Sequence, residues 1–124
     1  FRIWRDDCCT IEWDAMVDLT GVDIDRDVSM AKYNVDIYPN KHNLPAVGTK
    51  INKTAKISIL EAYPKDPVTG IRSKPAKKTE LESYEATLRE ECRVRHVLFE
   101  SYDSDYGILT FRANDFNHFP FVLP

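Results

Sequence analysis

Apolar and polar side chains alternate along two stretches in the first half of the chain. In the first stretch the apolar residues are Tyr33, Val35 and Ile37. In the second they are Ala55, Ile57 and Ile59. A period of two places alternate side chains on opposite faces of a strand, so each stretch predicts a half-buried β-strand. Pro39 ends the first strand, and the Tyr63-Pro64 pair ends the second.

A β-hairpin is predicted near the end of the chain. Two apolar segments, residues 97–102 and 108–113, flank a five-residue connection at residues 103–107. Gly107 can adopt the positive φ that such a connection requires. A further short apolar segment at residues 10–13, bounded by acidic residues, predicts another strand.

The chain contains one strong helix signal, at about residues 80–94. Apolar residues recur there at steps of three and four, at Leu81, Tyr84, Leu88 and Cys92. They form one apolar stripe that is expected to face a sheet. Thr79 and Glu82 match a capping box, in which each side chain satisfies an amide at the start of the helix. The charged residues opposite the stripe predict a solvated face.

These elements predict a single α+β domain over residues 1–124, with an antiparallel sheet or sandwich-like core flanked by one main helix. A chain of 124 residues buries roughly two thirds of its unfolded surface, which suffices for a core without metal or disulfide. The net charge of −3 without a basic stripe argues against direct nucleic-acid binding. No apolar run reaches the roughly 20 residues of a membrane helix. Because the chain does not begin with Met, we expect it to be a domain of a longer protein. We also expect this domain to be monomeric.

The cysteines do not predict a metal site. There are three of them, and they are Cys8, Cys9 and Cys92. An odd number without zinc-site spacing predicts free buried thiols in a reducing compartment. We therefore expect neither a structural zinc ion nor any cofactor.

An acidic run at Asp23, Asp25 and Asp27 resembles the start of a calcium loop. However, Val28 stands where that loop needs Gly, and Asn34 stands where it needs a bidentate Glu. A polar loop before the strand is therefore favoured over a calcium site.

No catalytic motif is recognisable from residue types and spacing. The histidines are scattered at His42, His96 and His118. No Gly-x-Ser-x-Gly motif or Cys and His pairing points to a nucleophile. Composition and spacing by themselves therefore predict an α+β domain without an assigned activity.

An ordered series of motifs nevertheless resembles one known family. The strand that ends in Tyr38-Pro39 is followed by a loop whose matching residues are Pro45, Val47, Gly48 and Asn52. The next strand ends in Tyr63-Pro64, and residues 1–5 and 10–13 resemble the family's opening strand pair. The chain thus resembles the autoproteolytic C-terminal domain of the GLFG-repeat nucleoporins, the class that includes nucleoporin 98. The resemblance covers nearly the whole chain, and the family's first helical segment is not matched.

The chain departs from this family at two places. Residues 6–9 replace a Gly-rich turn, which puts its positive-φ geometry in doubt. Family members also cut themselves between Phe and Ser of a His-Phe-Ser triplet. A gapless alignment, which we favour, places Asp115, Phe116 and Asn117 at that triplet. With a three-residue insertion, the triplet positions are His118, Phe119 and Pro120.

Neither alignment leaves a nucleophile for cleavage. An N-to-O acyl shift needs a hydroxyl, a base and a strained peptide bond. Asn has no hydroxyl, and Pro has neither a hydroxyl nor a backbone N–H. We therefore expect no enzymatic activity, with slow self-cleavage assisted by Asp115 as the alternative.

The resemblance implies a docking role at the nuclear pore complex, in the nuclear envelope. In this family the domain anchors an FG-repeat nucleoporin by binding a β-propeller nucleoporin, and its groove holds the tail of a scaffold nucleoporin. We expect partner contacts at Pro45, Val47, Gly48, Lys50 and Asn52. The chain's own tail is expected to fill the groove in cis, through Phe119, Phe121, Val122 and Leu123. The alternative for the tail is a frayed chain end. The alternative for the docking role is a peptide-binding adaptor outside the pore.

Overall fold

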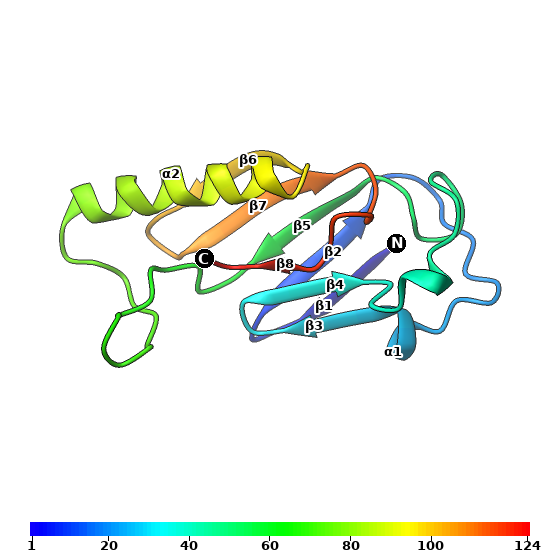
Figure 1. Cartoon of the computed structure of the whole chain (residues 1–124), viewed down its shortest axis with the longest axis horizontal. Coiled ribbons are helices and arrows are strands. Elements are labelled where there is room, and N and C mark those ends of the chain that lie inside the picture. The colour runs from blue at the N-terminus through cyan, green and yellow to red at the C-terminus, as the bar shows by residue number, and fades with distance from the viewer.

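Two antiparallel β-sheets and one long helix make up the computed structural model, which describes residues 1–124 (Figure 1). The larger sheet has five strands in the order β1-β2-β5-β7-β6. In that order they are Arg2–Arg5, Cys9–Trp13, Ala55–Ile59, Ile108–Ala113 and Leu98–Asp103. The smaller sheet has the order β3-β4-β8, formed by Val28–Ala31, Asn34–Ile37 and Phe121–Val122. The predicted α+β class is confirmed.

The elements are arranged in two layers. The five-stranded sheet forms one layer, and the three-stranded sheet and α2 (Lys78–Val94) lie side by side on one of its faces (Figure 1). Strand β8 runs between α2 and β4, in the middle of the second layer. The hydrophobic core lies between the layers and draws residues from both.

The predicted strands form, and their alternation determines which side chains face the core. The inward row across β2, β5 and β7 is fully buried and consists of Ile11, Ile57 and Phe111. The outward row, one position along, consists of Glu12, Lys56 and Arg112. A slip of one residue would exchange the two rows, so the apolar pattern fixes the register of the sheet.

Helix α2 presents the predicted stripe to the core but does not begin as predicted. Three of the four stripe residues are buried, and Leu81 is half-buried. The N-cap residue is Lys77, and no side chain caps the helix. The predicted capping box of Thr79 and Glu82 is therefore wrong. Because the helix begins at Lys78, Thr79 already lies inside the first turn and cannot serve as the N-cap.

The predicted hairpin between β6 and β7 is confirmed. The Asp103 carboxylate accepts hydrogen bonds from the amides of Asp105 and Tyr106 at 3.0 and 3.3 Å. Gly107 has a φ of 66°, and a Cβ at this position would come within 2.7 Å of the Tyr63 ring. Any other residue would strain the backbone and displace the ring, so the turn depends on glycine here.

The acidic run before β3 forms a one-turn helix where a polar loop was predicted. This helix, α1, spans Ile24–Asp27, and the Asp23 side chain caps it by accepting hydrogen bonds from the Asp25 and Arg26 amides. Asp27 is buried and accepts two hydrogen bonds from Arg26, both 2.8 Å long, which lower its pKa. These carboxylates thus stabilise the turn. Nowhere in the chain do three or more potential ligands gather as a metal site requires.

The three cysteines are buried and unpaired, as predicted. Burial raises the pKa of Cys92 to about 12, so this thiol stays protonated. The turn at residues 6–9 contains no residue with a positive φ. The chain therefore closes this turn without the backbone conformation that a Gly-rich sequence provides.

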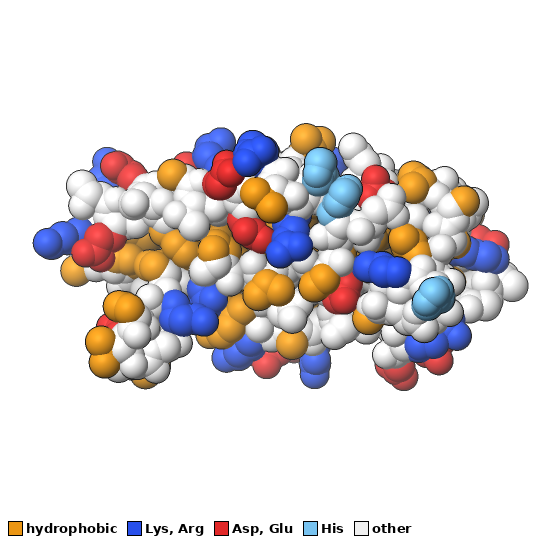
Figure 2. Space-filling model, in the orientation of Figure 1, with side chains coloured by type: hydrophobic (Ala, Val, Ile, Leu, Met, Phe, Trp, Pro, Cys, Tyr) orange, Lys and Arg blue, Asp and Glu red, His pale blue; other side chains and the backbone are white.

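Charged side chains of both signs are interspersed over the face of the molecule seen in Figure 2. This agrees with the absence of a basic stripe in the sequence. Neither helix combines the length and the apolar composition that crossing a bilayer requires.

Candidate functional site

Residues 44–52, which we call the loop, contact the segment after β7 through one buried side chain. Asn52 is fully buried. Its Oδ1 accepts a hydrogen bond from the Phe116 amide at 3.3 Å, and its Nδ2 donates to the Pro45 carbonyl at 2.8 Å. Its main-chain oxygen accepts a hydrogen bond from the Gly48 amide at 2.7 Å. Asn52 therefore closes the loop on itself and fixes it against Phe116.

The Phe116 carbonyl, which cleavage in the gapless alignment would attack, accepts hydrogen bonds from two donors. Lys41 Nζ and the Phe119 amide each lie 3.3 Å from its oxygen. Lys41 also donates to the Ile37 carbonyl at 3.3 Å and lies 3.5 Å from Asp36 Oδ1. Donors that converge on a carbonyl oxygen are the arrangement that stabilises a developing oxyanion. If the gapless alignment holds, these two donors would form the electrophilic half of a cleavage site.

The nucleophilic half has no counterpart at the residue that follows. Asn117 is exposed, and its amide donates a hydrogen bond to Asp115 Oδ1 at 3.1 Å. The carboxylate thus accepts a hydrogen bond from the nitrogen of the Phe116-Asn117 bond, which the gapless alignment places at the cut. An amide side chain offers no hydroxyl for Asp115 to deprotonate.

The other alignment also ends without a nucleophile. Phe119 is buried, and Pro120 is exposed. The His118 ring stacks on His96, with 4.1 Å between the ring centroids. Since Pro120 has neither a hydroxyl nor an amide hydrogen, this His-Phe pair precedes a residue that cannot attack.

Four of the five residues predicted to contact a partner reach the surface. Val47 is 57% exposed and lines, with Gly48 and Asn114, a pocket of about 310 Å³. Pro45 and Lys50 are half-buried. The fifth residue, Asn52, is fully buried and cannot touch a partner, so its prediction as a contact residue is wrong. Its amide is needed inside, where water cannot replace its hydrogen bonds.

The Lys50 side chain is already engaged within the domain. Its Nζ lies 2.9 Å from Asp18 Oδ2 and lowers the pKa of that carboxylate. Lys50 also has a positive φ of 51°. The loop thus presents a lysine whose charge is partly balanced, next to the exposed Val47.

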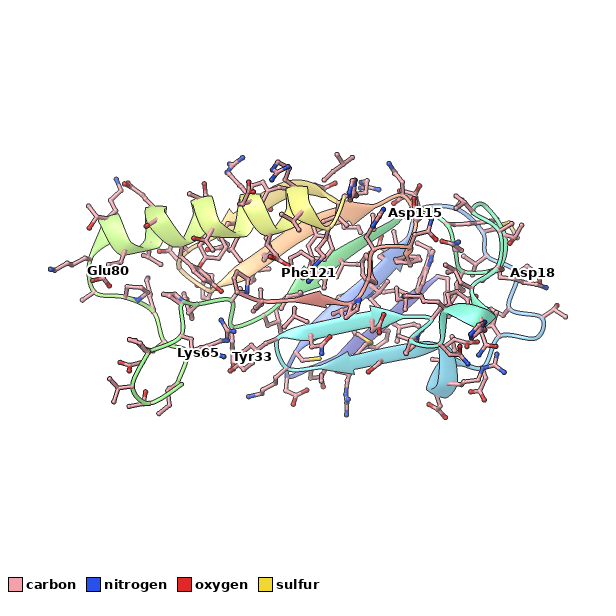
Figure 3. All side chains as sticks on the ribbon, viewed as in Figure 1. Asp18, Tyr33, Lys65, Glu80, Asp115 and Phe121 are labelled. Atoms are coloured by element: carbon pink, nitrogen blue, oxygen red, sulfur yellow. The ribbon has the colours of Figure 1, made fainter.

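Residues 118–124, which we call the tail, pack into the middle of the second layer. Phe119, Phe121 and Leu123 are buried, and Phe121 stacks on Phe111 with 4.4 Å between ring centroids. Figure 3 shows Phe121 between α2 and β4, whereas Asp115 lies beyond the end of β7. Val122 points outward and is 41% exposed. Three of the four tail residues singled out from the sequence therefore contact the core.

Arg72 and Lys41 were missed by the sequence analysis. Arg72 donates hydrogen bonds to the main-chain oxygens of Leu123 and Pro124, at 3.1 and 2.8 Å. The Tyr84 hydroxyl donates to the same Pro124 oxygen at 3.1 Å. Single basic residues in loops are usually solvated, so no local pattern distinguishes Arg72 or Lys41 from other surface charges.

Comparison with known proteins identifies the family. The profile of the family described as Nucleoporin2: Nup98-96 autopeptidase S59 matches residues 1–121. The chain belongs to this family. The resemblance to nucleoporin autoproteolytic domains is therefore confirmed.

Two relatives of this Nup98-96 family domain are nuclear pore complex proteins. The chain is 23% identical over 119 residues to the nuclear pore complex protein Nup98-Nup96 of Drosophila melanogaster. It is 24% identical over 119 residues to the protein of the same name from Dictyostelium discoideum. Each match covers 96% of the chain but only 6% of the relative. The chain is thus a nucleoporin domain, and its location is the nuclear pore complex, as expected.

Solved structures of nucleoporins share the fold of this Nup98-96 family domain. The C-terminal domain of NUP116 from Candida glabrata superposes with a TM-score of 0.80 and 27% identity, covering 92% of this chain and 74% of that one. A chain of the yeast heterotrimeric Nup82-Nup159-Nup116 nucleoporin complex superposes with a TM-score of 0.75 and 25% identity. This match covers 92% of this chain and 79% of that one. The Chaetomium thermophilum Nup145N APD T994A mutant fused to Nup145C N superposes with a TM-score of 0.73 and 21% identity, covering 94% of this chain and 78% of that one. At this identity the match shows only that the two chains share a fold.

Proposed function

We propose that this Nup98-96 family domain is a non-cleaving docking module that anchors an FG-repeat nucleoporin to the pore. The observation that carries the proposal is Asn117, which follows the buried Phe116 where self-cleavage requires a hydroxyl. In this proposal the domain has the family fold and two donors on the Phe116 carbonyl but lacks the attacking group. Its role is to bind rather than to cut.

Docking is supported by a structural neighbour that is itself part of a nucleoporin complex. The yeast neighbour is the heterotrimeric Nup82-Nup159-Nup116 complex. We propose a β-propeller nucleoporin as the partner of this domain, as the resemblance to the GLFG-repeat nucleoporins implies. No cofactor takes part, because docking needs only a complementary surface.

The accessible part of the loop is the proposed partner surface. Val47 is exposed beside a pocket, and Pro45 and Gly48 flank it on the same loop. Asn52 holds this loop from below through hydrogen bonds to Pro45 and Phe116. A loop that is rigid before binding loses little conformational entropy on binding, which favours affinity.

The tail supports a continuous chain through the former cleavage position. In the family the groove holds the tail of a scaffold nucleoporin. Here Phe119, Phe121 and Leu123 are packed in cis against the core. We propose that this packing lets the domain dock without a free end at Phe116. A scaffold nucleoporin tail would have to displace the tail to occupy the same space.

Replacing Val47 with Asp tests the docking surface. The new carboxylate would be desolvated against a partner, so we expect binding to a β-propeller nucleoporin to weaken at least about tenfold. Isothermal titration calorimetry with the purified partner would measure this. Val94→Asp is a matched control, because Val94 is 49% exposed at the end of α2, outside the loop.

Two results would count against the proposal. If Val47→Asp and Lys50→Glu both bind as the unaltered domain does, the loop is not the docking surface. If intact-mass spectrometry of the unaltered chain finds a fragment that ends at Phe116 or Phe119, the domain cleaves itself. Binding and cleavage are read out separately, so either half of the proposal can fail alone.

A further inference from the structure

One arginine, Arg72, binds the end of the tail through main-chain oxygens of the tail. Arg72 Nη2 donates to the Leu123 oxygen at 3.1 Å, and Nη1 donates to the Pro124 oxygen at 2.8 Å. The guanidinium lies over the Tyr33 ring, 4.8 Å from its centroid. Because both hydrogen bonds from Arg72 to the tail go to consecutive main-chain oxygens, it recognises an extended backbone rather than particular residues.

The same arginine closes a small hairpin at residues 65–72, which we call the Arg72 hairpin. Its ends meet in a bridge between Lys65 and Arg72. The Asp66 amide donates to the Ile71 oxygen at 2.9 Å, and the Gly70 amide donates to the Asp66 oxygen at 2.8 Å. Arg72 Nη1 further donates to the Tyr63 oxygen at 3.0 Å, at the base of this hairpin. The hairpin and the tail thus share one charged group.

We propose that Arg72 is a main-chain binding site for the tail and that it couples tail binding to the conformation of the Arg72 hairpin. Its ligand is an extended segment with two consecutive main-chain oxygens, here the chain's own residues 123 and 124. When the tail is in place, Arg72 is fixed and the hairpin is closed. When the tail leaves, Arg72 keeps only its contacts to Tyr63 and Tyr84, and the hairpin is held less firmly.

The geometry of the guanidinium explains why the coupling passes through this residue. Arg72 has acceptors at the tail, at Tyr63 and at the Tyr84 hydroxyl, 3.2 Å away. Its Nε is buried without a partner, so the outer nitrogens carry all of its hydrogen bonds. Loss of the tail removes the Leu123 and Pro124 acceptors from a half-buried charge. Such a charge then turns toward water, which weakens its hydrogen bond to the Tyr63 oxygen at the base of the hairpin.

The consequence reaches an exposed apolar surface. Val68 is 91% exposed and Ile71 is 64% exposed, both on the Arg72 hairpin. Figure 2 shows hydrophobic side chains on the loop that projects at the lower left, where Figure 1 places this segment. The position of these two side chains therefore depends on whether the tail is bound. Arg72 would act in this way whether or not the loop docks on another nucleoporin.

Amide hydrogen exchange, measured residue by residue by NMR, tests the coupling. The Leu123 amide, which donates to the Tyr33 oxygen at 2.9 Å, reports on the tail, and the Gly70 amide reports on the hairpin. In Leu123→Ala, which weakens tail packing and leaves Arg72 intact, we expect the Gly70 amide to exchange at least about tenfold faster. In Asp66→Ala, which disturbs only the hairpin, reciprocity requires the Leu123 amide to accelerate as well.

Two further variants test whether the effect depends on the contacts of Arg72. Lys74→Ala changes an exposed residue of the same connection, whose Nζ lies 3.4 Å from Asp105, and should alter neither amide. Arg72→Lys keeps the charge but removes the fork, so both amides should accelerate. If Leu123→Ala accelerates the Leu123 amide alone, or Asp66→Ala accelerates the Gly70 amide alone, the proposal is overturned.

Discussion

The loop and the Arg72 hairpin both hold residues 116–124, which we call the C-terminal segment, but they do so with different chemistry. Asn52 holds Phe116 through a neutral amide that is fully buried. Arg72 holds Leu123 and Pro124 through a half-buried charge. A buried neutral group that loses its partner finds no water to replace it, whereas a half-buried cation can turn to solvent. We therefore expect the first contact to persist in the folded domain and the second to be conditional.

The difference divides the C-terminal segment into two parts with separate roles. The part at Phe116 is built into the fold together with the proposed docking loop. The tail beyond it packs through its side chains but is held at its end by an exchangeable contact. A continuous peptide at Phe116, as proposed, would thus leave the proposed docking loop unchanged and place any mobility at the far end of the tail.

The largest expected effect comes from restoring the missing groups at the cleavage position. In Asp115→His with Asn117→Ser, the Ser hydroxyl would attack the Phe116 carbonyl, to which Lys41 and the Phe119 amide donate. The Phe116 acyl group would pass from the nitrogen of residue 117 to this hydroxyl as an ester, the freed nitrogen would take the proton, and water would hydrolyse the ester. We expect fragments of residues 1–116 and 117–124 in denaturing mass spectrometry. In native mass spectrometry the short fragment should stay bound through β8 and Arg72.

Two further variants make this prediction informative. Asp115→His with Asn117→Ala has no hydroxyl and should remain intact. Adding Arg72→Met to the cleaving pair should release the cut tail, since one of its anchors is then gone. An uncut Asp115→His/Asn117→Ser protein with a native fold would show that Phe116 does not occupy the former cleavage position.

The second prediction concerns the contact that we expect to persist. Replacing Asn52 with Ala leaves the Phe116 amide and the Pro45 carbonyl without partners in the interior. We expect the free energy of unfolding to fall by about 2–4 kcal/mol, measured by chemical denaturation. Asn43→Ala, at an exposed residue of the short 3₁₀ helix Lys41–Asn43, is the control and should change stability little. If the free energy of unfolding fell equally in the two variants, the buried Asn52 side chain would stabilise the fold no more than an exposed one.

The smallest expected effect is a selective response to acid. Asp66 accepts hydrogen bonds from the Val68 and Thr69 amides at 2.8 and 2.9 Å, which lower its pKa below the usual 3.8. A depressed carboxylate pKa stabilises the closed hairpin above pH 3.8, and this contribution is lost as the pH falls through the lower folded value. NMR should therefore show the Gly70 amide losing protection below about pH 4. The Phe116 amide, which is bound to the neutral Asn52, should keep its protection over the same range.

Local pattern was enough to predict most of the fold. Strands β4 and β5 and the turn at Gly107 were predicted from residues that lie within a few positions of one another. The structure contains both strands and the turn. The capping box failed because the motif indicates which residues can cap a helix but not where the helix starts. Thr79 lies one position past the first helical residue.

The connections at the site could not be read from the sequence. Asn52 and Phe116 are 64 positions apart, and Arg72 and Pro124 are 52 apart. Such a pairing depends on how the two layers meet, which no local periodicity encodes. Asn52 was singled out by resemblance but given a surface role, because a motif does not tell whether its residues face inward. Arg72 was not singled out at all.

The outward row of the five-stranded sheet has a consequence for how the domain behaves among its neighbours. Glu12, Lys56 and Arg112 lie side by side there, and Arg112 also bonds to Glu100 at 2.8 Å and pairs with Asp14. Another sheet stacked on this face would have to strip water from five charges at once. In an assembly that holds many proteins close together, this charged row disfavours the stacking of another sheet on the centre of the face.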